Sequence, residues 1–179
     1  MISKRPKAYP VTAESVTPQH EYAVEQVAAP YVVTPKLAPD IFASSYEAAP
    51  RERIAEIRRG IPARRIGELS VAMDLPKDKL MDFLGLSRAT VNRKAQSNQA
   101  LARDESERVV GVQVLVGQVQ ALVEESGVGG FDAARWVARW LGEPLPALGG
   151  DRPADYLDTI EGQKLVGQLL AMAGSGAYA

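Results

Sequence analysis

The sequence has 179 residues, of which 46% are hydrophobic and 24% charged, with a formal net charge of −1. This length and composition allow one or two small globular domains with a buried core. The chain has no Cys and a single His, which excludes disulfides, thiolate catalysis, Cys-based zinc sites and His-rich metal sites.

Residues 1–50 contain seven of the twelve prolines, and this spacing favours extended or irregular chain. We expect a flexible Pro-rich arm, with a short helix near residues 21–28. Its cations Lys4, Arg5 and Lys7 would contact a partner or DNA, or simply lie in a solvated tail. The segment lacks the apolar core of a signal peptide, and no apolar run in the chain is long enough to span a membrane, so we expect a cytoplasmic protein.

A helical domain is predicted from residue 51 to residue 103. Its first helix ends at Gly60, and Pro62 suits the first turn of the next, where its missing N–H costs nothing. The apolar positions are Ile54 and Ile57 in the first helix, and Ile66, Leu69 and Ala72 in the second. Pro76 ends the connection that follows, and Leu101 is expected to pack back on this bundle of four short helices.

Residues 77–94 (KDKLMDFLGLSRATVNRK) read as a helix-turn-helix. Leu80, Phe83 and Leu84 share one face of a short helix. Gly85 can adopt the left-handed conformation that ends a helix, and Ser87 can cap the second helix, which runs to about residue 97. The turn has the length that the motif needs.

The second helix of this motif can present donor-rich side chains outward while Leu86 and Val91 pack inward. Such donors contact phosphates and base edges in a major groove. The candidate DNA-binding residues are Ser87, Arg88, Thr90, Asn92, Arg93 and Lys94. An ordinary helical hairpin with a solvated basic face remains the alternative.

A long helix is predicted to begin at Asp104, with Glu107 completing a capping box, and to end at Gly127. Valine favours strands, but this run is too long for a strand and its period is helical. The apolar stripe consists of Val109, Val112, Val116, Val119 and Val123.

Two further helices are predicted in the last third of the chain. Asp132 caps the first, where Phe131 packs against Trp136 and Trp140 lies one turn further, as expected for core residues. After a turn from Pro153 to Leu157, Thr159 caps the last helix, which ends near Gly174. The residues expected to point inward from this helix are Leu165, Val166, Leu169, Leu170 and Met172.

Charge divides the chain into unlike parts. Residues 51–103 carry 12 Lys and Arg against 6 Asp and Glu, whereas residues 104–179 carry 5 against 11. A basic part suits nucleic acid and an acidic part suits a basic protein surface. The alternative is that charged residues on solvated helix faces happen to be distributed in this way, without any functional meaning.

The sequence contains no catalytic constellation. Nucleotide-binding glycine motifs and a zinc-protease helix are missing, and a Ser-His triad would need His20 in the predicted arm. The carboxylates Asp151, Asp155, Asp158 and Glu161 fit caps and first helical turns. We therefore expect a binding protein with no enzymatic activity, cofactor or metal.

Short motifs in a fixed order carry a family resemblance over about residues 51–179. They are Arg59-Gly60-Ile61-Pro62, the LGLSRATVNRK turn, Glu105-Ser106-Glu107-Arg108, Trp140-Leu141, Leu148-Gly149-Gly150, Arg152-Pro153 and Thr159-x-Glu161-Gly162. In this order and spacing they resemble the antitoxins of Xre–RES toxin–antitoxin modules, the Xre/MbcA/ParS type. The first 50 residues have no part in the resemblance.

The resemblance implies an all-α protein with an Xre-like helix-turn-helix domain at residues 51–103 and a helical toxin-binding domain at residues 104–179. It also implies a partner toxin with a RES domain that consumes NAD. The protein would bind operator DNA and repress its own operon, and it would form a homodimer within a larger complex. Dimerisation through the N-terminal region would use part of the helix-turn-helix surface.

For the toxin-binding surface, the sequence offers a loop and a tail. The candidate residues are Gly149, Asp151, Arg152, Gly176, Tyr178 and Ala179. An acidic helical domain would meet a cationic NAD cleft favourably, and Tyr178 with the Ala179 carboxylate would insert where the nucleotide lies. An ordinary frayed terminus is the alternative for the tail.

Two other functions remain open at this point. One is a stand-alone transcription regulator whose acidic half dimerises or senses a ligand. The other is an enzyme, which the missing constellations disfavour. A gene for a RES-domain toxin beside this one would favour the antitoxin.

Overall fold

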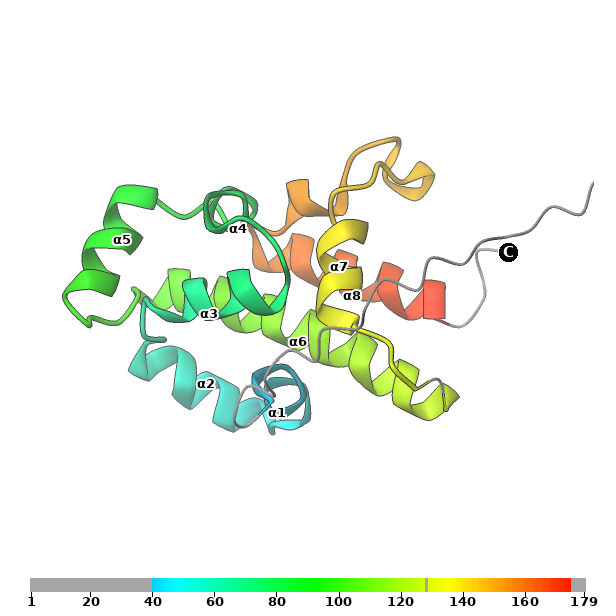
Figure 1. The fold of residues 1–179 in the computed structure, drawn as a ribbon, viewed down its shortest axis with the longest axis horizontal. Helices are drawn as coiled ribbons and strands as arrows, with labels where there is room; N and C mark the ends of the chain where they lie inside the picture. The colour runs from blue at the N-terminus through cyan, green and yellow to red at the C-terminus, as the bar shows by residue number, and fades with distance from the viewer. Residues whose placement is uncertain (1–39, 128, 175–179) are drawn as a thin grey trace, which may run out of the picture. The chain divides into compact units, whose positions relative to one another are not determined.

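A computed structural model describes residues 40–127 and 129–174, and within them the chain forms eight α-helices, two 3₁₀ turns and no β-strand (Figure 1). The α-helices are α1 (Ile41–Glu47), α2 (Pro50–Arg59), α3 (Arg65–Ala72), α4 (Lys77–Phe83), α5 (Arg88–Gln96), α6 (Arg103–Ser126), α7 (Ala133–Trp140) and α8 (Ile160–Gly174). The 3₁₀ turns are η1 (Pro146–Leu148) and η2 (Pro153–Tyr156). The predicted all-α fold is confirmed.

Helix α6 is the longest described helix and the centre of the packing. Its 24 residues extend over about 36 Å at the usual rise per residue. Helices α1, α2, α7 and α8 all pack against it (Figure 1). The buried residues of α6 are apolar on more than one face, as expected for a helix that several others cover. They include Val109, Val110, Val112, Leu115, Val116 and Val119.

Helix α1 lies in the segment that the sequence assigned to the flexible arm. Phe42 is buried, and Gln113 Nε2 on α6 donates a hydrogen bond to Ser45 Oγ at 3.1 Å. The structure therefore differs from the prediction for residues 40–50. A helix of seven residues between two prolines is too short to show apolar periodicity. Residues 1–39, which include the predicted helix near residues 21–28, lie outside the described part of the chain.

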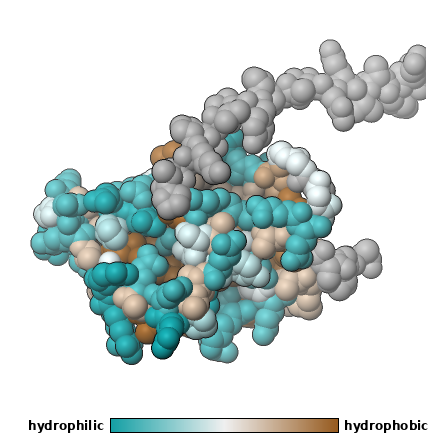
Figure 2. Space-filling view, turned by 90° about the horizontal axis from the view of Figure 1, so that it is seen from below, coloured by the Kyte–Doolittle hydropathy of each residue, from teal (hydrophilic) through white to brown (hydrophobic). Residues whose placement is uncertain are grey.

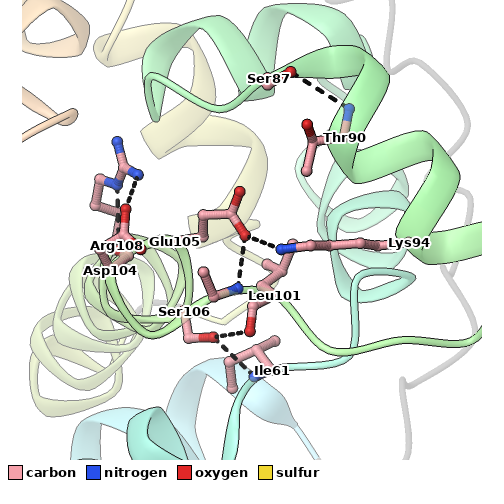
Figure 3. A network of polar contacts seen from close by, with 10 residues as sticks. Ile61, Ser87, Thr90, Lys94, Leu101, Asp104, Glu105, Ser106 and Arg108 are labelled. Carbon is pink, nitrogen blue, oxygen red and sulfur yellow. Dashed lines mark hydrogen bonds and ion pairs between the residues drawn. The ribbon is translucent and has the colours of Figure 1, made fainter.

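The predicted start of α6 is wrong by two residues. Ala102, not Asp104, is the N-cap, and Glu105 closes the capping box by accepting the Ala102 N–H at 2.6 Å. The same Glu105 oxygen accepts a hydrogen bond from Lys94 Nζ at 2.6 Å (Figure 3). A carboxylate that meets a backbone N–H and an ammonium is held more strongly than one that caps alone. Asp104 instead pairs with Arg108 one turn further along α6.

Two other local predictions fail because of tertiary packing. Helix α3 begins at Arg65, and Pro62 forms an isolated antiparallel bridge with Ala100 instead of opening the helix. On α8, Leu165 and Met172 are exposed, while Val166, Leu169 and Leu170 are buried as predicted. Val166, Leu169 and Leu170 belong to the buried face of α8, which packs on α6, whereas Leu165 lies outside that face.

The predicted helix ends and the remaining caps are confirmed. Gly60, Gly85 and Gly127 have positive φ angles at the ends of α2, α4 and α6. Asp132 Oδ1 accepts the Arg135 N–H at 3.0 Å, and Thr159 Oγ1 accepts the Gly162 N–H at 3.1 Å. The Phe131 and Trp136 rings lie 6.0 Å apart. The Trp136 and Trp140 rings stack at the same separation, half-buried against the core.

We expect Gly117→Ala to lower the free energy of unfolding by about 1 to 3 kcal/mol, the usual cost of overpacking. A Cβ at Gly117 would lie 2.3 Å from the Phe42 carbonyl oxygen, so α1 would have to move away from α6. Urea unfolding measures the effect. The control is Gly67→Ala in α3, where a Cβ meets nothing within 4 Å and stability should rise by about 0.5 to 1 kcal/mol. Equal stabilities for the two variants would contradict the close packing of α1 on α6.

Candidate functional site

Helices α4 and α5 form the predicted helix-turn-helix. Gly85 has a φ of +58°, and Ser87 Oγ accepts the Thr90 N–H at 3.4 Å at the start of α5 (Figure 3). Leu80, Leu86 and Val91 are buried and hold the two helices together, as the sequence predicted. The turn also contacts α6, because Arg108 Nη1 donates a hydrogen bond to the Gly85 carbonyl oxygen at 3.2 Å.

Arg88 lies at the N-terminus of α5 and is exposed, but it already has acidic partners. Its guanidinium bonds to the Asp82 carboxylate and lies 3.7 Å from Asp78. The hydrogen bond to Asp82 and the negative charge of that carboxylate raise the pKa of Arg88. Because this pair is open to solvent, its contribution to stability is small.

The other predicted DNA-binding residues divide into two groups. Lys94 points inward to Glu105, and the two side chains are only 17% and 13% exposed (Figure 3). Arg93 and Asn92 are exposed on α5, with Asn92 Oδ1 accepting a hydrogen bond from Lys77 Nζ at 2.7 Å. The structure therefore leaves Arg88, Asn92 and Arg93 exposed on α5, and it turns Lys94 toward Glu105.

Between α7 and α8, a closed loop carries the predicted toxin-binding residues of the second half. The Leu145 N–H donates to the Asp151 carbonyl oxygen and the Gly150 N–H to the Leu145 carbonyl oxygen, both at 3.0 Å. Gly149 and Gly150 have φ angles of +70° and +98°, which side chains rarely adopt, so glycine suits this turn. Asp151 is exposed beside them.

Arg152 and Asp155 fix the end of this loop. The Arg152 backbone N–H and guanidinium both donate to the Asp155 carboxylate, with the Nη2 to Oδ1 distance at 2.6 Å. These bonds lower the pKa of Asp155 and raise that of Arg152. Next to them, the Tyr156 hydroxyl donates to Asp151 Oδ2 at 3.0 Å. The loop thus presents its charged groups in fixed positions. Gly176, Tyr178 and Ala179 lie outside the described residues.

The helix-turn-helix and the loop adjoin each other. A cavity of about 370 Å³ between them is lined by Asp82 and Gly85 on one side and by Arg152, Asp155 and Asp158 on the other. Asp82 lines this cavity and also pairs with Arg88, so the start of α5 lies close to the loop of residues 145–156. Sequence reasoning missed the roles of Asp82, Arg108 and Glu105, because each contacts a residue of another helix or turn: Arg88, Gly85 and Lys94 respectively.

Within residues 40–127 and 129–174, no helix is long and apolar enough to cross a membrane. The same residues contain no group of three or more His, Cys, Asp or Glu side chains that could hold a metal ion.

Comparisons with known proteins agree with the motifs. Residues 52–113 match the family model of the antitoxin Xre-like helix-turn-helix domain, and residues 119–176 match that of the antitoxin Xre/MbcA/ParS C-terminal toxin-binding domain. The chain is also similar to a protein of Sphingobium sp. (strain YBL2) named Prs ADP-ribosylating antitoxin. The two are 46% identical over 142 residues, which cover 79% of this chain and 89% of that relative.

We expect Asp151→Asn to lower the pKa of Tyr156 back toward its usual value. The hydrogen bond to Asp151 and its negative charge favour the neutral phenol and raise that pKa. The hydrogen bond between Tyr156 and Asp151 therefore contributes to stability at neutral pH, and this contribution is lost as pH rises through the pKa of Tyr156. The Tyr156 Cζ shift in an NMR titration measures it, with Asp158→Asn as the control. An unchanged titration in Asp151→Asn would show that the loop does not hold this contact.

Proposed function

Since the chain belongs to the Xre/MbcA/ParS family of antitoxins, we propose that it binds and blocks a RES-domain toxin that consumes NAD, and that it represses its own operon through α5. Membership of the family makes it an antitoxin, a protein without enzymatic activity. The observation that carries the proposal is the match of residues 119–176 to a toxin-binding domain. We place the interaction in the cytoplasm.

The name of the relative supports the proposal that the partner toxin consumes NAD. That protein is an ADP-ribosylating antitoxin by name, and ADP-ribosylation takes its ADP-ribose from NAD. A cleft that binds NAD needs cationic groups for the pyrophosphate. Residues 104–179 of this chain carry 11 Asp and Glu against 5 Lys and Arg, so the two surfaces would be electrostatically complementary.

The loop of residues 145–156 supports a preformed contact surface. Gly149 and Gly150 set its turn, and Arg152 is fixed by Asp155 before any partner arrives. A loop that is ordered in advance loses little entropy on binding. We propose that Gly149, Asp151 and Arg152 contact the toxin around its cleft, while the segment after α8, with Gly176, Tyr178 and Ala179, enters the nucleotide site.

We expect a chain that ends at Gly174 to bind the toxin without silencing it. In cells that co-express the toxin encoded by the neighbouring gene, the full chain should restore growth and NAD levels. The shortened chain should still co-purify with the toxin but leave both low, because the nucleotide site stays open. Tyr178→Ala is the variant of full length that tests the aromatic ring alone. If the shortened chain protects cells as well as the parent, the tail does not block the site.

For the DNA-binding role, the exposed side chains of α5 support a contact with an operator. They include Arg88, Asn92 and Arg93, in a segment that carries 12 Lys and Arg against 6 Asp and Glu. Ser87 and Thr90 at the start of α5 could donate to phosphates, as helix N-termini do. We further propose a homodimer within the toxin complex, since paired half-sites match a two-fold protein.

We expect Arg93→Gln to weaken operator binding and to reduce the dependence of log K on log salt by about one charge, as loss of one phosphate contact does. Arg88→Ala should act in the same direction. Lys94→Gln is the matched control, because Lys94 is turned toward Glu105; it should lower stability and leave the salt slope unchanged. Fluorescence anisotropy at several salt concentrations gives both quantities. An Arg93→Gln protein that binds like its parent at every salt concentration would move the operator contact away from α5.

The stand-alone transcription regulator that the sequence left open is not favoured, because the helix-turn-helix model that residues 52–113 match is that of an antitoxin domain.

A further inference from the structure

The first residue of α5 is a cation that the protein itself already binds. Arg88 Nε donates to Asp82 Oδ1 at 3.1 Å, and Arg88 Nη2 donates to Asp82 Oδ2. Arg88 Nη1 also lies 3.7 Å from Asp78 Oδ2. Both carboxylates belong to α4 and are four residues apart, so they share one face of that helix. The first helix of the helix-turn-helix therefore holds the first cation of the second helix.

These bonds use the same donors that a specific DNA contact would need. A guanidinium binds two acceptors side by side, whether they belong to a carboxylate, to a phosphate, or to the O6 and N7 of guanine. While Nε and Nη2 of Arg88 are bound to Asp82, that edge of the guanidinium is occupied, and Asp78 lies near the remaining Nη1. The Asp82 carboxylate is thus a competitor of nucleic acid for Arg88.

The pair is of little use to the packing of the helices. The side chains of Arg88 and Asp82 are 51% and 54% exposed, and pairs this open to solvent add little to stability. The other ion pair of α5 is different, because Lys94 and Glu105 are nearly buried and Glu105 also caps α6. Helix α5 therefore has one cation fixed by packing and another whose bond costs little to break.

The surroundings of the pair suit a charged partner. Figure 2 shows the molecule from below, where the end that carries α5, at the left of Figure 1, presents mostly hydrophilic residues. Among the ion pairs of the described residues, α5 contributes only those of Arg88 and Lys94. The exposed Arg93 is therefore available to any phosphate, whereas Arg88 has first to leave Asp82.

We propose that Asp82, assisted by Asp78, makes Arg88 available to the operator and withholds it from DNA of other sequence. A phosphate backbone attracts Arg93 whatever the sequence, but Arg88 leaves Asp82 only for a pair of acceptors held in a matching position. Any other duplex brings its phosphates toward two carboxylates that repel them and gains no contact in return. This inference rests on the proposed operator contact of α5, and it makes Asp82 a residue that determines specificity.

Fluorescence anisotropy of the full chain with two duplexes of equal length tests this role. One duplex is the promoter of its own operon, and the other has the same bases in shuffled order. Asp82→Asn should bind the shuffled duplex about five to ten times more tightly than the parent at about 0.1 M salt, and the dependence of log K on log salt should rise by about one charge, because Arg88 then adds a phosphate contact. The promoter should gain less, so the preference for it falls.

Asp74→Asn is the matched control, because it removes the same charge in the same domain. Asp74 precedes α4, its side chain is 72% exposed, and it lies 3.9 Å from Arg135. Its φ of +51° is one that Asn adopts as readily as Asp. This variant should change the affinity for the shuffled duplex by less than about two-fold, as expected for an exposed charge away from the contact.

Two further variants separate the release of Arg88 from a general loss of negative charge. Arg88→Ala combined with Asp82→Asn should return the affinity for the shuffled duplex to that of the parent, since the two residues act as one pair. Asp78→Asn should act like Asp82→Asn with a smaller gain, and it provides a second measurement if Asp82→Asn folds poorly.

Equal affinities of Asp82→Asn and Asp74→Asn for the shuffled duplex would overturn the proposal, as would a gain that persists without Arg88. The pattern of results also distinguishes this role from the operator function on which it rests. A parent chain that binds both duplexes equally would overturn the operator contact together with this role. A parent chain that prefers its promoter, with Asp82→Asn behaving like Asp74→Asn, would overturn this role alone.

Discussion

Two glycines of α6 let the neighbouring helices α8 and α1 pack closely on it. A Cβ at Gly111 would lie 1.7 Å from Gln163 Oε1, and one at Gly117 would lie 2.3 Å from the Phe42 carbonyl oxygen. These gaps let α8 approach one side of α6 and α1 another. The buried Gln163 then donates to the carbonyl oxygens of Arg108 and Leu157, which fixes α8 and the loop before it. The positions of both candidate surfaces depend on this packing.

The contact between Lys94 and Glu105 shows how packing redirects a charged residue. Both side chains are nearly buried, and breaking such a pair leaves an uncompensated charge. Lys94 therefore joins α5 to the start of α6, while Arg88 and Arg93 stay at the surface. Ser106 adds to the same junction, since its Oγ accepts the Ile61 N–H at 3.0 Å (Figure 3). The first turn of α6 thus holds both α5 and the segment that leads into α3.

Local rules predicted most helices and many of their ends. Apolar spacing identified α2 to α8, Gly127 ended α6, and Asp132 and Thr159 capped α7 and α8. Failures occurred where tertiary packing decided the outcome: Glu105 caps α6 with Lys94 beside it, and Leu165 lies outside the buried face of α8. For the candidate site, the sequence pointed to Arg152 and Arg88, but not to their partners Asp155 and Asp82.

The two family models meet inside α6, one ending at residue 113 and the other beginning at residue 119. The intervening residues are helical and include the buried Leu115, Val116 and Gly117. No linker separates the halves, so they should unfold in one cooperative transition. A protease that captures this opened state would destroy the proposed DNA-contacting surface and the proposed toxin-contacting surface in a single event. The two proposed roles would then be lost together.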